Sequence, residues 1–173
     1  VVIMPDYEGF GVSSDRTHPY LAEEVTAHQT VDAMTFGLQV YQHLVDEGSA
    51  LALSHTWRSF TLGYSQGGSV ALATHRYIEQ HNLYNELHFR GSLCGDGPYD
   101  LITTLQYYLF DNGTSYEVTT DHRQGQCTLP VVIPMIMRGM MLSDPYAGSH
   151  SLSDYLSQQF LDTGIMEWLK SKD

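Results

Sequence analysis

Basic residues are scarce in this chain of 173 residues. Eight lysines and arginines stand against twenty aspartates and glutamates, which gives a formal net charge of −12 with histidine neutral. A surface with this charge repels the phosphates of nucleic acids and the anionic headgroups of membranes. We therefore expect no nucleic-acid partner.

Long apolar runs are also missing. A membrane-spanning helix needs about 20 consecutive apolar residues. The longest candidate, residues 129–142 (LPVVIPMIMRGMML), is interrupted by Pro134 and Arg138. We therefore expect no integral membrane segment.

Cysteine is limited to Cys94 and Cys127. In an exported protein these residues could form one disulfide, and otherwise they are two buried free thiols; the sequence leaves both alternatives open. Histidine is frequent, with nine residues, but none lies in an HExxH pattern or beside a pair of cysteines. Because those patterns are typical of metal-binding sequences, we expect no metal site.

The composition is that of a globular domain, with 42% hydrophobic and 16% charged side chains. Short apolar runs at 1–5, 59–65 and 87–95 predict buried strands. Apolar residues recur every three to four positions across 21–48 and 66–82, which predicts two amphipathic helices. This alternation predicts an α/β fold in which a parallel sheet is flanked by helices.

The pattern changes after the third predicted strand. Residues 98–173 contain helix-like segments at 99–110, 131–142 and 151–171, and no further alternation of strands. We therefore divide the chain into an α/β core, 1–97, and a helical lid subdomain, 98–173, that lies over one end of the sheet.

The stretch LGYSQGG, residues 62–68, places Ser65 in a G-x-S-x-G pattern. Ser65 lies where a predicted strand turns sharply into a predicted helix. We therefore expect a strained backbone that admits only small residues two positions before and after it, at Gly63 and Gly67. Such a turn pushes the serine hydroxyl outward. Gly68 is expected to let the helix pack closely on the sheet.

This turn can be interpreted as a catalytic nucleophile turn or as a structural loop. Ser65 is the candidate nucleophile, and the N–H of Gln66 is a candidate oxyanion-hole donor, because a helix start favours negative charge on a substrate oxygen. The alternative is an ordinary glycine-rich loop, such as one that cradles phosphate, although no lysine stands in a Walker-type position. The strand–turn–helix context favours the nucleophile.

Three stretches resemble the α/β-hydrolase superfamily, and the likeness extends over the whole chain. VVIMPDYEGFGVSS carries the D-Y-x-G-x-G pattern of a strand and loop two elements before the nucleophile, here Asp6, Tyr7, Gly9 and Gly11. LGYSQGG resembles the nucleophile turn, and RGSLCGDGPYDL resembles the next strand and its exit loop. The long helical region that follows is similar to the lid of the secreted lipase and esterase branch. Cutinases share G-Y-S-Q-G but lack this insertion.

The resemblance implies a serine hydrolase that cleaves carboxylic esters through an acyl-enzyme on Ser65. Such an enzyme needs no cofactor, acts on a small ester or lipid-like substrate, and is secreted or periplasmic. An exopeptidase with the same triad is an alternative. A catalytically inactive hydrolase-like module that only binds a ligand is another.

In that family the triad follows the chain order Ser, Asp, His, with the acid and the histidine after the lid. We therefore expect this chain to be an internal fragment that is completed by the remaining segments of its parent chain. The chain also contains candidates that follow Ser65 in the correct order. The candidate acid is Asp96 or Asp100, and the candidate histidine is His122 or His150. Simpler interpretations are a turn former for Asp96, a helix cap for Asp100 and solvated loop residues for both histidines.

Two further groups keep alternative interpretations. Asp6 is assigned to organising its loop, while Tyr7 and Phe10 either face the substrate cleft or pack beneath the turn. The apolar residues of the helical region either line an acyl or alcohol pocket or form helix-packing core. These residues are Met135, Met137, Met140, Met141 and Leu142.

Overall fold

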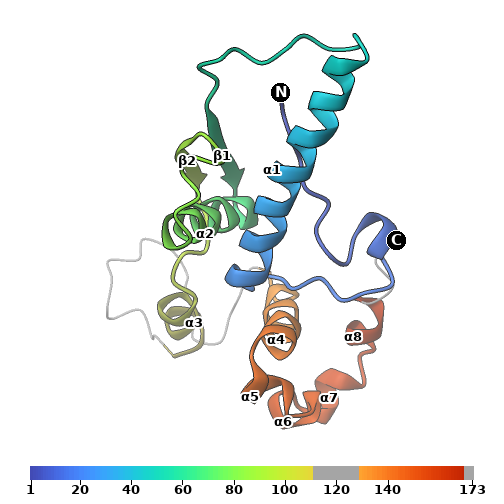
Figure 1. Cartoon of the computed structure of the whole chain (residues 1–173). Coiled ribbons are helices and arrows are strands. Elements are labelled where there is room, and N and C mark those ends of the chain that lie inside the picture. The colour runs from blue at the N-terminus through green and yellow to red at the C-terminus, as the bar shows by residue number, and fades with distance from the viewer. Residues whose placement is uncertain (111–128, 170–173) are drawn as a thin grey trace.

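The computed structural model of the chain describes residues 1–110 and 129–169. Figure 1 shows the order of the elements along the chain. They are η1 (Gly11–Ser13), α1 (Glu23–Asp46), β1 (Ser59–Tyr64), α2 (Gln66–Gln80), β2 (Phe89–Gly95), α3 (Leu101–Phe110), α4 (Val132–Ser143), α5 (Pro145–Gly148), α6 (Leu152–Tyr155), α7 (Gln158–Leu161) and α8 (Ile165–Trp168).

The two strands form a parallel pair in which Leu62 lies opposite Leu93 and Tyr64 opposite Gly95. Both strands contact α2, and α1 packs mainly on α2 and meets the start of β2 in the core cluster. The predicted α/β class, with parallel strands and flanking helices, is confirmed for strands 59–64 and 89–95.

The prediction of a strand at residues 1–5 is wrong. This segment has no assigned strand structure, and the side chains of Val2 and Met4 are each 84% exposed. It runs beside α1, where Gly37 leaves room for the side chain of Ile3; a Cβ atom on Gly37 would lie 2.7 Å from Ile3 Cδ1. An apolar run favours extended backbone, but a strand also needs a neighbouring edge for its hydrogen bonds, and no described strand lies beside this segment.

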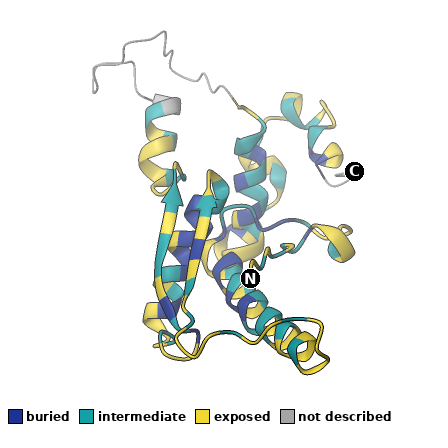
Figure 2. Cartoon of the chain, turned by 90° about the horizontal axis from the view of Figure 1, so that it is seen from above, coloured by how far each residue is buried: buried dark blue, intermediate teal, exposed yellow. Residues whose placement is uncertain are grey.

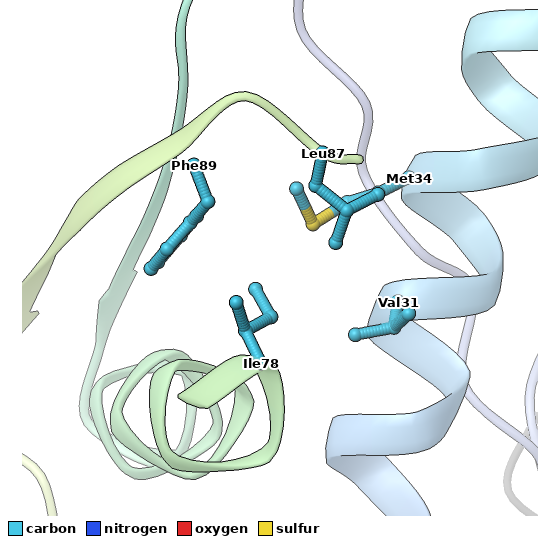
Figure 3. Close-up of a cluster of buried hydrophobic side chains, with 5 residues drawn as sticks. All are labelled: Val31, Met34, Ile78, Leu87 and Phe89. Carbon is cyan, nitrogen blue, oxygen red and sulfur yellow. The ribbon is translucent and has the colours of Figure 1, made fainter. Parts of the chain in front are cut away.

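The core lies where α1, α2 and the start of β2 meet (Figure 3). Val31 and Met34 extend from α1 toward Ile78 of α2 and Phe89 of β2. Ile78 and Phe89 are completely buried. The two predicted amphipathic helices therefore bury their apolar stripes against each other and against one face of the strand pair.

The opposite face of the strand pair is apolar and exposed. Phe60, Leu62 and Tyr64 of β1 alternate with Thr61, whose hydroxyl lies 3.2 Å from the Ala71 carbonyl oxygen of α2. Leu93 of β2 is exposed in the same way, and Figure 2 shows exposed residues along both strands. The helices therefore cover only one face of the strand pair in the described part of the chain.

The C-terminal part is helical, as predicted, but less regular. Helix α4 matches the predicted segment, whereas the single helix expected over 151–171 is replaced by the short helices α6, α7 and α8. Helices α6 and α7 each begin after a capping serine: Ser151 forms a capping box with Asp154, and Ser157 accepts a hydrogen bond from the Phe160 N–H. Gly164, with a φ of 73°, interrupts the helical backbone before α8.

Across 1–110 and 129–169, the helices are too short or too polar to pass through a lipid bilayer.

Candidate active site

Ser65 lies in the turn between β1 and α2, with φ 55° and ψ −122°. Its N–H donates to the Gly95 carbonyl at 2.9 Å, and its own carbonyl accepts from the Gly68 N–H at 2.9 Å. A positive φ at a residue with a Cβ costs about 1–3 kcal/mol and persists only where the surroundings enforce it. These two bonds enforce it here, and the Ser65 side chain is exposed at the carboxyl end of the strands.

Close backbone approach explains one of the two flanking glycines. A Cβ atom on Gly63 would overlap the carbonyl group of Gly67, so position 63 must be glycine. A Cβ atom on Gly67 would meet no atom of the described chain within 4 Å. The expectation that only small residues fit is therefore confirmed at Gly63 and wrong at Gly67, because the contact is one-sided.

Gly68 and Gly97 bring the start of α2 against the exit of β2. A Cβ atom on Gly68 would lie 2.6 Å from the Gly95 carbonyl oxygen, and one on Gly97 would lie 2.7 Å from the Ser69 nitrogen. The predicted packing role of Gly68 is confirmed.

The strain at Ser65 predicts an unusual order of stability for two substitutions. We expect Ser65→Gly to have a free energy of unfolding about 1 kcal/mol higher than Ser65→Ala, because only glycine relieves the positive φ. Chemical denaturation of both variants measures this. The matched pair Ser49→Gly and Ser49→Ala, at an exposed loop residue without positive φ, should show no such preference. Equal free energies of unfolding for Ser65→Ala and Ser65→Gly would contradict the backbone strain at position 65.

Gln66 is the first residue of α2, so its N–H belongs to the helix turn whose N–H groups have no partner inside the helix. Its side-chain Nε2 lies 2.6 Å from Nε2 of His18, a residue 48 positions away. The role of the Gln66 N–H as an oxyanion donor stays a prediction.

His18 is a site residue that the sequence patterns did not predict. This residue is only 6% exposed, and its Nδ1 lies 2.9 Å from the Glu8 carbonyl oxygen. Its ring lies 4.9 Å from that of Phe10 and 6.0 Å from that of Tyr7, centroid to centroid. The one available signal was its position shortly after the D-Y-x-G-x-G motif, and that signal does not indicate a contact with Gln66.

The loop before His18 is organised as predicted. The Asp6 carboxylate packs on the backbone of Gly11, which has a φ of 53°, so closely that a Cβ there would overlap it. Tyr7 is half-buried next to His18, and burial raises the pKa of its hydroxyl, offset in part by a hydrogen bond with Thr30. These contacts favour the packing interpretation for Tyr7, whereas Phe10 is 41% exposed and keeps both interpretations.

Asp96 and Asp100 make local hydrogen bonds. Asp96 has a φ of 46°, which is typical of a turn, and accepts from the Tyr64 hydroxyl at 3.2 Å. Asp100 accepts from the backbone N–H of Thr103 at 2.9 Å and from its hydroxyl at 2.7 Å, and these bonds lower the pKa of Asp100. These contacts agree with the turn and cap interpretations of the two carboxylates.

His150 is held within the C-terminal helices. Its Nδ1 donates to the Tyr146 carbonyl at 2.8 Å, and its ring packs against Tyr146 and Tyr155. His122 lies outside the described residues. Within 1–110 and 129–169, the hydroxyl of Ser65 has no hydrogen bond with a histidine or a carboxylate.

The apolar residues of α4 divide between two environments. Met135 lines a small cavity of about 30 Å³ together with Thr17, His18, Tyr20, Arg138 and Leu169. Met140 and Leu142 are exposed instead, at 50% and 58%. These three residues are therefore not buried core, and the pocket interpretation stays a prediction.

The described residues include one of the two cysteines and several histidines and carboxylates. Cys94 is a half-buried free thiol there, and Cys127 lies outside them. In that same part of the chain, no three histidine, cysteine or carboxylate side chains come together in a way that could hold a metal ion.

No protein-family model, no curated protein and no solved structure matches this chain. The geometry around Ser65 is therefore the observation from which its function has to be inferred.

Proposed function

We propose that this chain carries the nucleophile of a serine hydrolase that acts on carboxylic esters, as in the lipase and esterase branch of the α/β-hydrolase superfamily that it resembles. The observation that supports the proposal is the conformation of Ser65. A strained serine between a parallel strand and a helix, with its side chain exposed, is the arrangement that a G-x-S-x-G nucleophile requires. With φ 55° and ψ −122°, Ser65 lies outside the left-handed helical region that turn residues commonly adopt, and such strain is concentrated at functional sites.

In this reaction the Ser65 oxygen attacks the ester carbonyl carbon while its proton passes to a histidine outside the described residues. The carbonyl π electrons move to the oxygen, and the Gln66 N–H at the start of α2 donates to that oxyanion. Collapse of the tetrahedral intermediate expels the alcohol, which takes up the proton, and leaves an acyl-enzyme. Attack by water then releases the carboxylic acid and restores the hydroxyl.

The same proposal assigns supporting roles to the rest of the chain. Residues 98–173 would act as a lid beside the substrate, and the exposed Met140 and Leu142 of α4 suit contact with an apolar acyl chain. The triad acid and histidine would be residues that the structure does not describe.

One observation favours a second function. Because no described histidine or carboxylate bonds the Ser65 hydroxyl, a scaffold that has lost its triad and only binds a ligand would keep the same turn. Such a module would bind esters without turnover.

Hydrolysis of p-nitrophenyl acetate, butyrate and octanoate by the full-length protein tests the proposal. We expect turnover that falls by about 10⁴-fold or more in Ser65→Ala, whereas Ser49→Ala, at an exposed loop serine, leaves it unchanged. A folded protein without turnover supports the binding module. Undiminished turnover in Ser65→Ala removes Ser65 from the mechanism.

A further inference from the structure

His18 forms a buried link between two segments that are distant in sequence. It belongs to the loop that follows the D-Y-x-G-x-G motif, and its ring reaches the first residue of α2 next to the nucleophile. Polar atoms that are buried to this extent are expected to be hydrogen-bonded on both sides of the ring.

The two partners of His18 determine which nitrogen carries the proton. The Glu8 carbonyl oxygen, 2.9 Å from Nδ1, can only accept, so Nδ1 carries a hydrogen and donates it. In the neutral ring Nε2 then has a free lone pair, and it accepts a hydrogen bond from the side-chain amide N–H of Gln66 at 2.6 Å. His18 therefore fixes the orientation of the Gln66 amide.

The loop that carries His18 is itself anchored on α4. The Arg138 guanidinium donates to the Thr17 hydroxyl, and a Cβ atom on Gly139 would overlap the backbone of Tyr20. Phe10 packs edge-on against the His18 ring. The contacts of the loop with α4 and of the ring with Phe10 together hold the imidazole, so it can act as a fixed support for Gln66.

We propose that His18 is a positioning residue of the proposed ester hydrolysis. By holding the side chain of Gln66, it fixes the first turn of α2 so that the Gln66 N–H points at the oxyanion that forms on the substrate. This inference rests on the proposed function. Because Nε2 is already engaged by Gln66, His18 is a support and not the general base.

A double-mutant cycle with His18→Phe and Gln66→Leu tests this inference in the full-length protein. His18→Phe keeps an aromatic ring among the neighbouring rings but has no nitrogen for Glu8 or Gln66, and Gln66→Leu removes the amide. The active sites are first counted by titration with a fluorophosphonate. For each variant we then measure kcat per titrated site and KM with p-nitrophenyl butyrate as substrate. A purely structural role would change the fraction of sites that titrate and the melting temperature, but not kcat per titrated site.

We expect each single variant to lower kcat about tenfold or more with KM within about twofold, since a small displacement of a donor that acts only in the transition state affects kcat. The double variant should fall no further than the stronger single variant, because both remove the same link. His43→Phe, on the exposed face of α1, should leave kcat unchanged.

Three results overturn the inference. They are unchanged kcat in Gln66→Leu, independent effects that multiply in the double variant, and complete loss of titratable sites in folded His18→Phe, which would make His18 the base. If His18→Phe does not fold, Gln66→Leu alone decides by its kcat. A wild-type protein that neither titrates nor hydrolyses esters refutes the proposed function instead.

Discussion

Gly63→Ala is expected to abolish ester hydrolysis and to destabilise the protein, whereas Gly67→Ala is expected to do neither. A methyl group on Gly63 would occupy the space of the Gly67 carbonyl, so either β1 or the first turn of α2 must move. Such overpacking costs about 1–3 kcal/mol. Because Ser65 lies midway between the two glycines, the movement also displaces the nucleophile from the strained conformation that the reaction requires.

Each glycine variant adds one methyl group to the wild-type chain, so the two variants form a matched pair. A Cβ on Gly67 meets open space, and alanine is at least as suitable as glycine inside a helix. Turnover of p-nitrophenyl esters by the full-length protein and denaturation midpoints measure both effects. Equal activity of the two variants would show that the close approach of Gly63 to Gly67 does not position Ser65.

Phe89→Ala is expected to lower the free energy of unfolding by about 3–5 kcal/mol. Phe89 is completely buried at the start of β2, where it packs with Ile78 and stacks edge-on against His75 at 5.0 Å between centroids. Removing the ring leaves a cavity in the cluster that joins α1, α2 and β2 (Figure 3).

Phe60→Ala provides the control for this substitution. Phe60 lies on the neighbouring strand, but it faces away from α2 and is 57% exposed, so we expect a loss of about 1 kcal/mol or less. Urea denaturation of the wild type and both variants measures the difference. Similar losses in the two variants would place the core elsewhere.

Local sequence patterns predicted both a helix that buries its apolar stripe and a strand whose apolar side chains are exposed. Strand 59–64 and helix 66–80 could be recognised because one face of each is apolar with the matching period and because glycines mark the turn between them. The apolar run at residues 1–5 has the same local signal as a strand. Residues 1–5 do not form a strand, because strand pairing requires the hydrogen-bonding edge of a second strand. A local sequence pattern does not encode the presence of that second strand.

In the candidate site, too, features set by neighbouring residues could be predicted, whereas contacts between distant residues could not. The Ser65 turn could be predicted from the five adjacent positions 63–67. The contact between His18 and Gln66 joins residues 48 positions apart, and only the packing of the loop against α2 brings them together. The different space around Gly63 and Gly67 could not be predicted either. The G-x-S-x-G pattern is symmetric, but only a Cβ atom on Gly63 would overlap the backbone of the other glycine.

The most direct test of the proposed chemistry is the intact mass of the full-length protein after incubation with a fluorophosphonate, followed by peptide mapping. An activated serine reacts with this reagent, whereas an ordinary serine does not. We predict a single adduct per chain, located on Ser65 and absent from Ser65→Ala. A folded protein that acquires no adduct, or an adduct on another residue, would contradict the assignment of Ser65 as the nucleophile.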